Sequence, residues 1–393
     1  MRRLAAVLLM LLATVGVARG QPAHEGPARI ELYTMGPGND LFESFGHGTL
    51  CVINDKYPSG ACYNYGTTDF RDPVRLVWNF LRGRARFWVS RMPLPLMISA
   101  YSEQDRTIYR QAIPLSGDAA EQLAAMLEND TRPENKYYVY NHYVENCTTR
   151  LRDYLNIASN GELAQGADVP TGQTWRDVTL RGFAIDIRLL VGMEFLVGRA
   201  VDTRMTLWNA MFLPDVLRSE VQKRLHADVE VVNVRRAPIP NTPPLAGRWL
   251  VLAVAGALTV LNAFAAILGR PRLWRFVRHL DGLVLGAIGA LVYVTALVVT
   301  LVELRRNEVL LVCLPTDFLL LVLTGRALWV YLVARLALIV VVAVALLAGA
   351  LIQPMLAALA LVAGPLTVAA VRELQNARRP PQEAAVAGGG SSP

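Results

Sequence analysis

Residues 245–372 form an almost uninterrupted aliphatic stretch, and this feature limits the possible folds more than any other. About 20 consecutive apolar residues are enough to cross the hydrocarbon core of a bilayer as an α-helix. Five apolar segments are expected to cross the membrane. Because the third of them, at about 309–324, is short, a bundle of four spans is the alternative. Most charged residues lie between positions 22 and 240, which predicts a soluble domain followed by an all-α transmembrane bundle. The apolar segments expected to cross are about 249–268, 282–302, 309–324, 327–350 and 354–371.

The arginines indicate how this bundle is oriented and what it faces. If the residues before the bundle lie outside the cytoplasm, the arginine-rich first loop and the C-terminal tail lie inside, as the positive-inside rule requires. Arg305 and Arg306 fall on the outer side, where we expect Glu303 and Glu308 to pair with them. The net charge of +7 is concentrated at the ends of apolar segments, which favours anionic lipid headgroups rather than nucleic acid as the partner.

The first 20 residues have the pattern of a secretory signal peptide. Arg2 and Arg3 precede an apolar run from Leu4 to Val17, and the small residues around Gly20 are typical of a cleavage site. We therefore expect the domain that follows to be exported to an oxidising compartment, where disulfides can form.

The exported segment begins with strand patterns and continues with helical ones. Alternating runs between residues 28 and 70, separated by Gly, Pro, Asn and Asp, predict a short antiparallel meander. Residues 74–90 are interpreted as a helix and residues 97–104 as a further strand. Ser116 is expected to cap a helix that runs to Asn129, because apolar residues recur there at helical spacing.

The four cysteines have different expected roles. Cys51 and Cys62 flank a turn-rich stretch between two strand-like runs, so they could form a disulfide across a hairpin. Cys313 lies in an apolar segment, where a lone cysteine is usually a small buried hydrophobic residue. Cys147 is then an unpaired thiol in an exported domain, and such a thiol calls for a chemical explanation.

Cys147 and His47 together have the pattern of a thiol–imidazole pair. The run NCTTRLRDYLN predicts a helix capped by Asn146, so Cys147 would lie in the first turn, where the positive end of the helix favours a thiolate. His47 lies a hundred residues earlier among strand residues and could serve as the base. Either residue alone would more often be structural. Papain-like enzymes place the cysteine first, so the reverse order here predicts a circularly permuted arrangement.

The runs FGHGTL, YNYGTTDF and YYVYNHYVENCTTRLRDYL look like the bacterial family of exported domains that includes the Lnb-type lipoprotein N-acyltransferases. The run MFLPDVL and the multi-span C-terminus fit that family as well, and the resemblance covers residues 29–217. The family is similar to the circularly permuted branch of the NlpC/papain-like cysteine enzymes. The resemblance therefore implies an α+β exported domain in which Cys147 is the nucleophile and His47 its general base and acid.

Four further residues are candidates for the same site. The third, orienting residue is expected on the strand YNYGTTDF, where Asn64 is our choice and Tyr65 is the competitor. Asn146 is expected to cap the helix, and its side chain or the Cys147 N–H could also line an oxyanion hole. Arg150 could position a phosphate group or, as we favour, form a salt-bridged scaffold with its neighbours.

The function implied by the resemblance is acyl transfer at the outer face of the inner membrane. The Cys147 thiolate would take an acyl chain from a phospholipid, at its sn-2 ester, and form a thioester. The α-amine of a diacylglyceryl-cysteine lipoprotein would then accept the chain, with no metal or dissociable cofactor required. The alternative is a membrane-anchored cysteine peptidase or amidase that acts on peptidoglycan, although such an enzyme needs one anchor at most. A non-enzymatic membrane sensor or assembly factor is the third interpretation.

These observations divide the chain into six expected parts. They are a signal peptide at 1–20, the permuted papain-like catalytic domain at 21–160, a helical and loop extension at 161–234, a Pro-rich linker at 235–248, the transmembrane bundle at 249–372 and a disordered cytoplasmic tail at 373–393.

Overall fold

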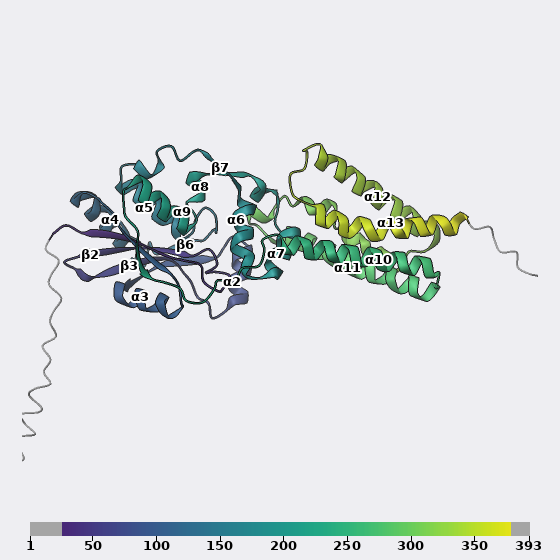
Figure 1. Ribbon diagram of the computed structural model, residues 1–393, viewed down its shortest axis with the longest axis horizontal. Helices are drawn as coiled ribbons and strands as arrows, with labels where there is room; N and C mark the ends of the chain where they lie inside the picture. Colours follow the sequence, from purple (N-terminus) through teal and green to yellow (C-terminus); the bar gives the residue numbers. More distant parts are fainter. Residues whose placement is uncertain (1–25, 379–393) are drawn as a thin grey trace, which may run out of the picture.

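An α+β domain and a helical bundle lie end to end in the computed structural model, which describes residues 26–378 (Figure 1). This arrangement confirms the fold class expected from the sequence. The predicted signal peptide lies outside the described residues, as does the part of the predicted tail from residue 379 onward.

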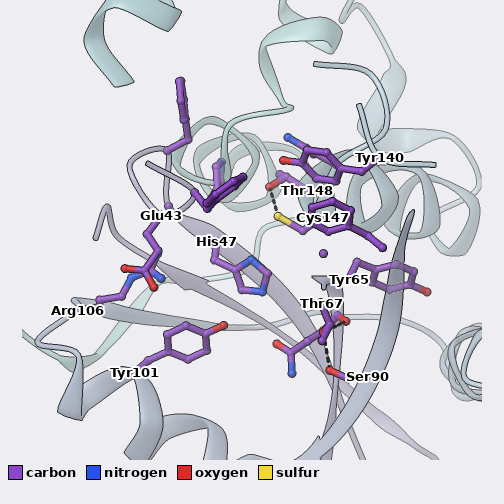
Figure 2. Close-up of a pocket in the computed structure, with 18 of the residues that line it drawn as sticks. Glu43, His47, Tyr65, Thr67, Ser90, Tyr101, Arg106, Tyr140, Cys147 and Thr148 are labelled. Carbon is purple, nitrogen blue, oxygen red and sulfur yellow. Dashed lines mark hydrogen bonds between the residues drawn. The ribbon is translucent and has the colours of Figure 1, made fainter. Parts of the chain in front are cut away.

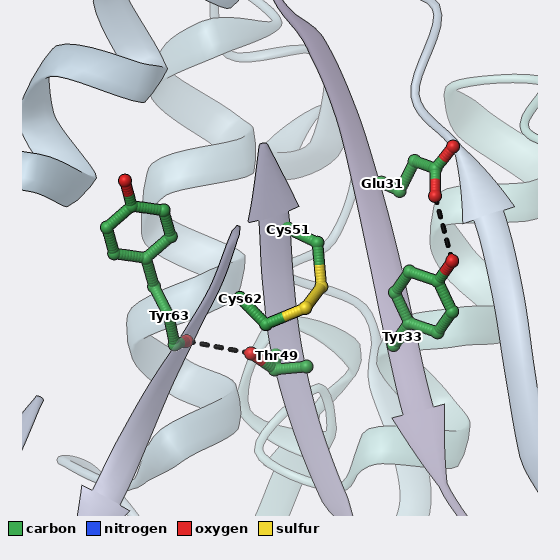
Figure 3. Close-up of a disulfide and its surroundings, with 6 residues drawn as sticks. All are labelled: Glu31, Tyr33, Thr49, Cys51, Cys62 and Tyr63. Carbon is green, nitrogen blue, oxygen red and sulfur yellow. Dashed lines mark hydrogen bonds between the residues drawn. A yellow bond between two sulfur atoms is a disulfide. The ribbon is translucent and has the colours of Figure 1, made fainter. Parts of the chain in front are cut away.

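The α+β domain is built on a seven-stranded sheet in which every pairing is antiparallel. The strand order is β6-β4-β3-β2-β1-β5-β9. The predicted meander corresponds to the three central strands, and the Cys51–Cys62 disulfide joins β2 to β3 (Figure 3). The strands are β1 (Arg29–Met35), β2 (His47–Asn54), β3 (Tyr57–Thr67), β4 (Arg86–Pro93), β5 (Ile108–Ala112), β6 (Tyr137–Val139) and β9 (Glu230–Asn233).

Helices cover both faces of the sheet and bury a separate apolar core on each (Figure 1). On one face lie α4 (Gly117–Asp130), α5 (Cys147–Ala158) and α9 (Pro214–Arg224). On the other face, α3 (Leu94–Glu103) packs Met97 over the disulfide. Ser116 caps α4 by accepting a hydrogen bond from the Ala119 N–H at 3.3 Å, as predicted.

Two segments differ from the expected secondary structure. Residues 97–103 lie in helix α3 rather than in a strand, and Gln104 is its C-cap, because Pro95 occupies the first helical turn and the Leu, Met and Ala that follow favour helix. Residues 74–90 contain helix α2 (Pro73–Leu81) and then strand β4, with Gly83 between them in the left-handed region at φ 59°. The strand is held by backbone pairing with β3 and β6.

Residues 161–234, expected as a helical and loop extension, contribute a strand and a helix to the α+β domain. Their last strand, β9, pairs with β5 at the sheet edge, and α9 packs on the sheet. The remaining elements are η1 (Glu162–Ala164), β7 (Pro170–Thr174), α6 (Trp175–Gly182), η2 (Phe183–Ile185), α7 (Ile187–Phe195), η3 (Arg199–Asp202), β8 (Arg204–Thr206) and α8 (Leu207–Ala210). Among them, η1 packs on α5 and α9, and β7 pairs with β8.

Among the described residues, four helices are long and apolar enough to cross a membrane. They are α10 (Ala246–Leu268), α11 (Pro271–Val298), α12 (Gly325–Leu347) and α13 (Leu356–Arg378). The fifth span expected at 309–324 is not a long α-helix. It consists mainly of two 3-10 helices, η5 (Glu308–Leu311) and η6 (Pro315–Leu321).

This 3-10 segment runs antiparallel to α11 along a stripe of glycines. Leu314 lies against Gly289 and Leu320 against Gly282, where a Cβ atom on either glycine would crowd the segment. The close approach lets the segment return along α11, so that α12 starts at the end of the bundle where α11 also starts (Figure 1). Arg335 holds the segment from α12 through two 2.8 Å hydrogen bonds to the Asp317 carboxylate.

Polar side chains join the bundle to the domain, and they correct the pairing expected for Glu303 and Glu308. Glu303 accepts a hydrogen bond from the Asn141 amide at 3.1 Å, and Glu308 pairs with Arg199 at 3.0 Å. Both acidic residues therefore contact the α+β domain rather than the neighbouring Arg305 and Arg306. Sequence proximity suggested the wrong partners because the loop before α12 folds against η3.

Candidate active site

Cys147 is placed at the start of α5 by the capping residue predicted for it. The Asn146 side chain accepts a hydrogen bond from the Thr149 N–H at 2.8 Å, and the Thr149 hydroxyl accepts one from the Asn146 N–H at 2.9 Å. The Asn146 amide also donates to the carbonyl oxygens of His142 at 2.9 Å and Phe212 at 3.1 Å. Because both amide hydrogens are engaged, Asn146 fixes the helix start and is not free to donate to a bound oxyanion.

Replacing Asn146 with alanine should lower the free energy of unfolding by about 2–4 kcal/mol. The lost cap costs ~1 kcal/mol, and two carbonyl groups lose their donor. Thermal unfolding of the detergent-solubilised protein measures the change. Asn156→Ala is the control, because its side chain makes one bond, to the Ala164 N–H, near the other end of α5. Equal destabilisation by the two variants would contradict the role given to Asn146.

His47 is the first residue of β2 and lines the same cavity as Cys147. The cavity has a volume of about 330 Å³. Figure 2 shows the His47 ring between Cys147 and Tyr101, and the ring stacks on Tyr101 with centroids 5.9 Å apart. The residue before it, Gly46, has φ 85°, and a Cβ there would lie 2.7 Å from the Met35 carbonyl oxygen. The turn that delivers His47 therefore requires glycine.

The surroundings of Cys147 lower the pKa of its thiol. Burial acts against ionisation, but the nearby His47 imidazole outweighs it and lowers the pKa of Cys147 to about 7. The Thr148 hydroxyl, 3.7 Å from the sulfur, and the Gly48 N–H contribute in the same direction. A thiol whose pKa lies near the ambient pH combines a large thiolate fraction with high nucleophilicity.

Asn64 lies on the strand next to His47 and faces the same cavity. Cys51 pairs with Cys62 across β2 and β3, so the alternation of side chains puts His47 and Asn64 on the sheet face that carries the disulfide. The Asn64 side chain is 5% exposed, and neither amide atom has a hydrogen-bond partner among the described residues. A buried amide without partners is costly, so its position at the cavity wall favours a role toward the imidazole or a bound group.

Tyr65, the competitor for the orienting role, is engaged elsewhere. Its ring lines the cavity, but its hydroxyl donates to Asp130 at 2.8 Å on the far side (Figure 2). Tyr154 donates to the same carboxylate. Tyr65 therefore supports the wall of the cavity, and Asn64 stays our candidate for the residue that orients His47.

We expect Asn64→Ala to reduce the rate of the acyl transfer expected from the sequence roughly tenfold to hundredfold, because a misoriented base loses part of the contribution of general acid–base catalysis. Initial rates of acyl transfer measure the effect. Asn54→Ala is the control, since Asn54 accepts the Tyr57 N–H in the β2–β3 turn away from the cavity. Equal rates for the two variants would remove Asn64 from the site.

Arg150 does not line the cavity. Its guanidinium pairs with Glu145 and packs over the ring of Tyr138, 4.9 Å from the centroid. Arg152 similarly pairs with Asp153 at 2.8 Å. These contacts agree with the role favoured for Arg150 from the sequence, that of a salt-bridged scaffold.

Tyr101 and Arg106 line the cavity but were not predicted. Arg106 is buried and donates two hydrogen bonds to the Gly36 carbonyl oxygen, at 2.9 and 2.7 Å. Its guanidinium lies over the Tyr101 ring, 5.2 Å from the centroid, and adds positive charge to the cavity. Burial raises the pKa of Tyr101 to about 12, so its hydroxyl stays protonated. The sequence did not indicate Tyr101 as a cavity residue because residues 97–104 were interpreted as a strand, whereas they belong to the α3 region.

His142 is a second imidazole at the cavity, with different properties. Burial lowers its pKa to about 4, so the ring is neutral at pH 7. The ring packs against Phe45 at 4.3 Å and Phe212 at 5.6 Å between centroids. His47, rather than His142, is the imidazole that lowers the pKa of Cys147. Over residues 26–378, no group of three or more His, Cys, Asp or Glu residues is arranged to hold a metal ion.

The architecture and the cavity define a membrane protein with an exported-type α+β domain that pairs a helix-start cysteine with a strand-start histidine. Residues 27–181 match the family model of the Lnb N-terminal periplasmic domain. The family expected from the sequence is therefore confirmed. No curated protein and no solved structure matches the chain.

Proposed function

We propose that the protein is a lipoprotein N-acyltransferase that works by covalent catalysis at Cys147. His47 takes the thiol proton, and the thiolate attacks the carbonyl carbon of a phospholipid ester, at the sn-2 position in our proposal. The Cys147 N–H, at the positive end of α5, faces the oxyanion that forms. The C–O bond then breaks, His47 returns its proton to the departing alkoxide, and lysophospholipid leaves a thioester on Cys147.

The second half-reaction restores the thiolate. The α-amine of a diacylglyceryl-cysteine attacks the thioester carbonyl, and His47 accepts the amine proton. The C–N bond forms, the C–S bond breaks, and the N-acylated lipoprotein leaves. The net reaction moves one acyl chain from an oxygen to a nitrogen.

The position of Cys147 at the start of α5 and of His47 at the start of β2, both lining one cavity with aromatic walls, is the observation that carries this proposal. The lowered pKa of Cys147 agrees with it. Phe42, Phe45 and Phe70 line the cavity, as suits an acyl chain. The domain is also joined to apolar helices, for example by the Asn307 amide, which donates to the Phe195 carbonyl oxygen at 2.7 Å, and this supports a lipid as the donor. The match of residues 27–181 to the Lnb N-terminal periplasmic domain supports the same chemistry.

The test is transfer of an acyl chain to a defined acceptor. Purified protein in phospholipid vesicles is incubated with a diacylated lipopeptide that has a free N-terminal amine, and the product is analysed by mass spectrometry. We expect the acceptor to gain one acyl chain on nitrogen. An acceptor with an acetylated amine should stay unchanged. Cleavage of the peptide without acylation would instead favour the peptidase or amidase alternative.

A further inference from the structure

Helix α2 exposes an apolar stripe next to the cavity. Val74, Val77, Trp78 and Leu81 recur at helical spacing, and Val74 and Trp78 are 79% and 50% exposed. Leu76, on the opposite side of the helix, is buried in the domain. The stripe is thus a second apolar face, in addition to the one that attaches α2 to the sheet.

Arginines flank this stripe. Arg75 lies on the helix beside it, and Arg82 follows at the C-cap with its guanidinium 5.8 Å from the centroid of the Trp78 ring. An apolar stripe with Trp, bordered by arginines, is typical of a helix that lies in the plane of a membrane surface. The arginine side chains can reach the phosphate groups while their stems lie along apolar surface.

The position of α2 relative to the bundle matches this interpretation. The Leu81 carbonyl accepts a hydrogen bond from the Thr300 N–H at 3.1 Å, just beyond the end of α11 at Val298. Figure 1 shows α2 at the end of the domain that faces the bundle. A residue two positions past a spanning helix lies at the membrane boundary, so α2 is held at the level of the outer leaflet.

Two exposed aromatic rings connect α2 with the cavity. Phe70 lies three residues before the first residue of α2 and meets Phe42 edge to face, with centroids 5.5 Å apart. Both rings line the cavity that contains Cys147, yet they are 55% and 43% exposed. Exposed phenyl rings at a cavity mouth would be costly in water but not in contact with acyl chains.

We propose that α2 is an in-plane interfacial helix in the outer leaflet, and that phospholipid acyl chains pass from it over Phe42 and Phe70 to Cys147. The passage of chains rests on the proposed function; the membrane contact of α2 does not. This route differs from entry of the acyl chain between the transmembrane helices.

The membrane contact is tested by the depth of a fluorescent label in the full-length protein. Val74→Cys is labelled in a Cys147→Ser, Cys313→Ala background and reconstituted into vesicles of phosphatidylethanolamine and phosphatidylglycerol. Ile157→Cys is the control, since Ile157 is 58% exposed on α5 away from α2. Lipids with a nitroxide near the headgroup should quench the label at 74 at least twofold more than the label at 157. Equal quenching would overturn the proposal, whether or not the protein transfers acyl chains.

The route is tested by comparing two donors. Val74→Asp should lower the rate with phospholipid in vesicles at least tenfold, and leave the rate with a dispersed short-chain phospholipid within twofold of wild type. Equal losses with both donors would show that the substitution damages the site, and would overturn the route. Inactivity of the wild type with both donors would count against the proposed function and leave the depth measurement valid.

Discussion

Replacing Cys147 with serine is expected to abolish acyl transfer, with a loss of at least ~10³-fold in turnover. Serine keeps the volume and the position at the start of α5, but a hydroxyl is not ionised by the interactions that bring the thiol pKa to about 7. Turnover with phospholipid and diacylated lipopeptide measures the effect.

The other free cysteine provides the control for this result. Cys313 is buried in the bundle, so Cys313→Ala should retain turnover within about twofold. If Cys147→Ser kept more than a small fraction of the wild-type rate, covalent catalysis through this thiol would be ruled out.

His47→Gln is expected to produce the second large loss, about 10²–10⁴-fold in turnover, because it removes the general base and acid. It should also raise the pKa of Cys147, since burial would then act without the opposing imidazole. The shift moves ionisation of the thiol to higher pH. In the wild type the thiolate fraction grows as pH rises through about 7, and in the variant it grows only at higher pH.

The pH dependence of alkylation by iodoacetamide measures this shift without any lipid substrate. We expect the midpoint of the alkylation rate to rise in His47→Gln by at least one pH unit, roughly tenfold in the ionisation equilibrium. The exposed His226, replaced with glutamine in the same way, is the matched control and should leave the midpoint unchanged. An unshifted midpoint in His47→Gln would mean that the imidazole does not act on the sulfur.

The features predicted correctly depend on local sequence. A helix cap is determined by neighbouring residues, so Asn146 and the start of α5 at Cys147 could be predicted from the run NCTT. The β2–β3 hairpin is similarly local, and its turn brings Cys51 and Cys62 together. His47 was predicted from its position among strand residues, and the structure places it at the start of β2.

The features that were missed depend on tertiary contacts. Tyr101 and Arg106 reach the cavity because α3 folds over the disulfide face of the sheet, and the pattern of residues 97–104 resembled a strand. β9 joins the sheet only after the chain has passed through the extension, so nothing local predicts its pairing with β5. Its backbone partner is more than a hundred residues earlier in the sequence.

The expected fifth spanning helix was also predicted wrongly because its structure depends on tertiary contacts, here within the bundle. Residues 309–324 have the composition of a short span, but Pro315 and the tight packing on Gly282, Gly286 and Gly289 favour 3-10 geometry. Hydropathy measures how apolar a segment is and carries no information about the helix on which it packs. The buried Asp317–Arg335 pair in this segment likewise becomes visible only in three dimensions.

The central claim is that Cys147 carries an acyl chain, and the mass of the intact protein tests it most directly. Purified protein is incubated with phospholipid without any acceptor, then measured before and after treatment with hydroxylamine. We predict an added mass of one fatty-acyl group that hydroxylamine removes and that Cys147→Ser does not acquire. An unmodified mass, in protein whose Cys147 still reacts with iodoacetamide, would contradict the acyl-enzyme.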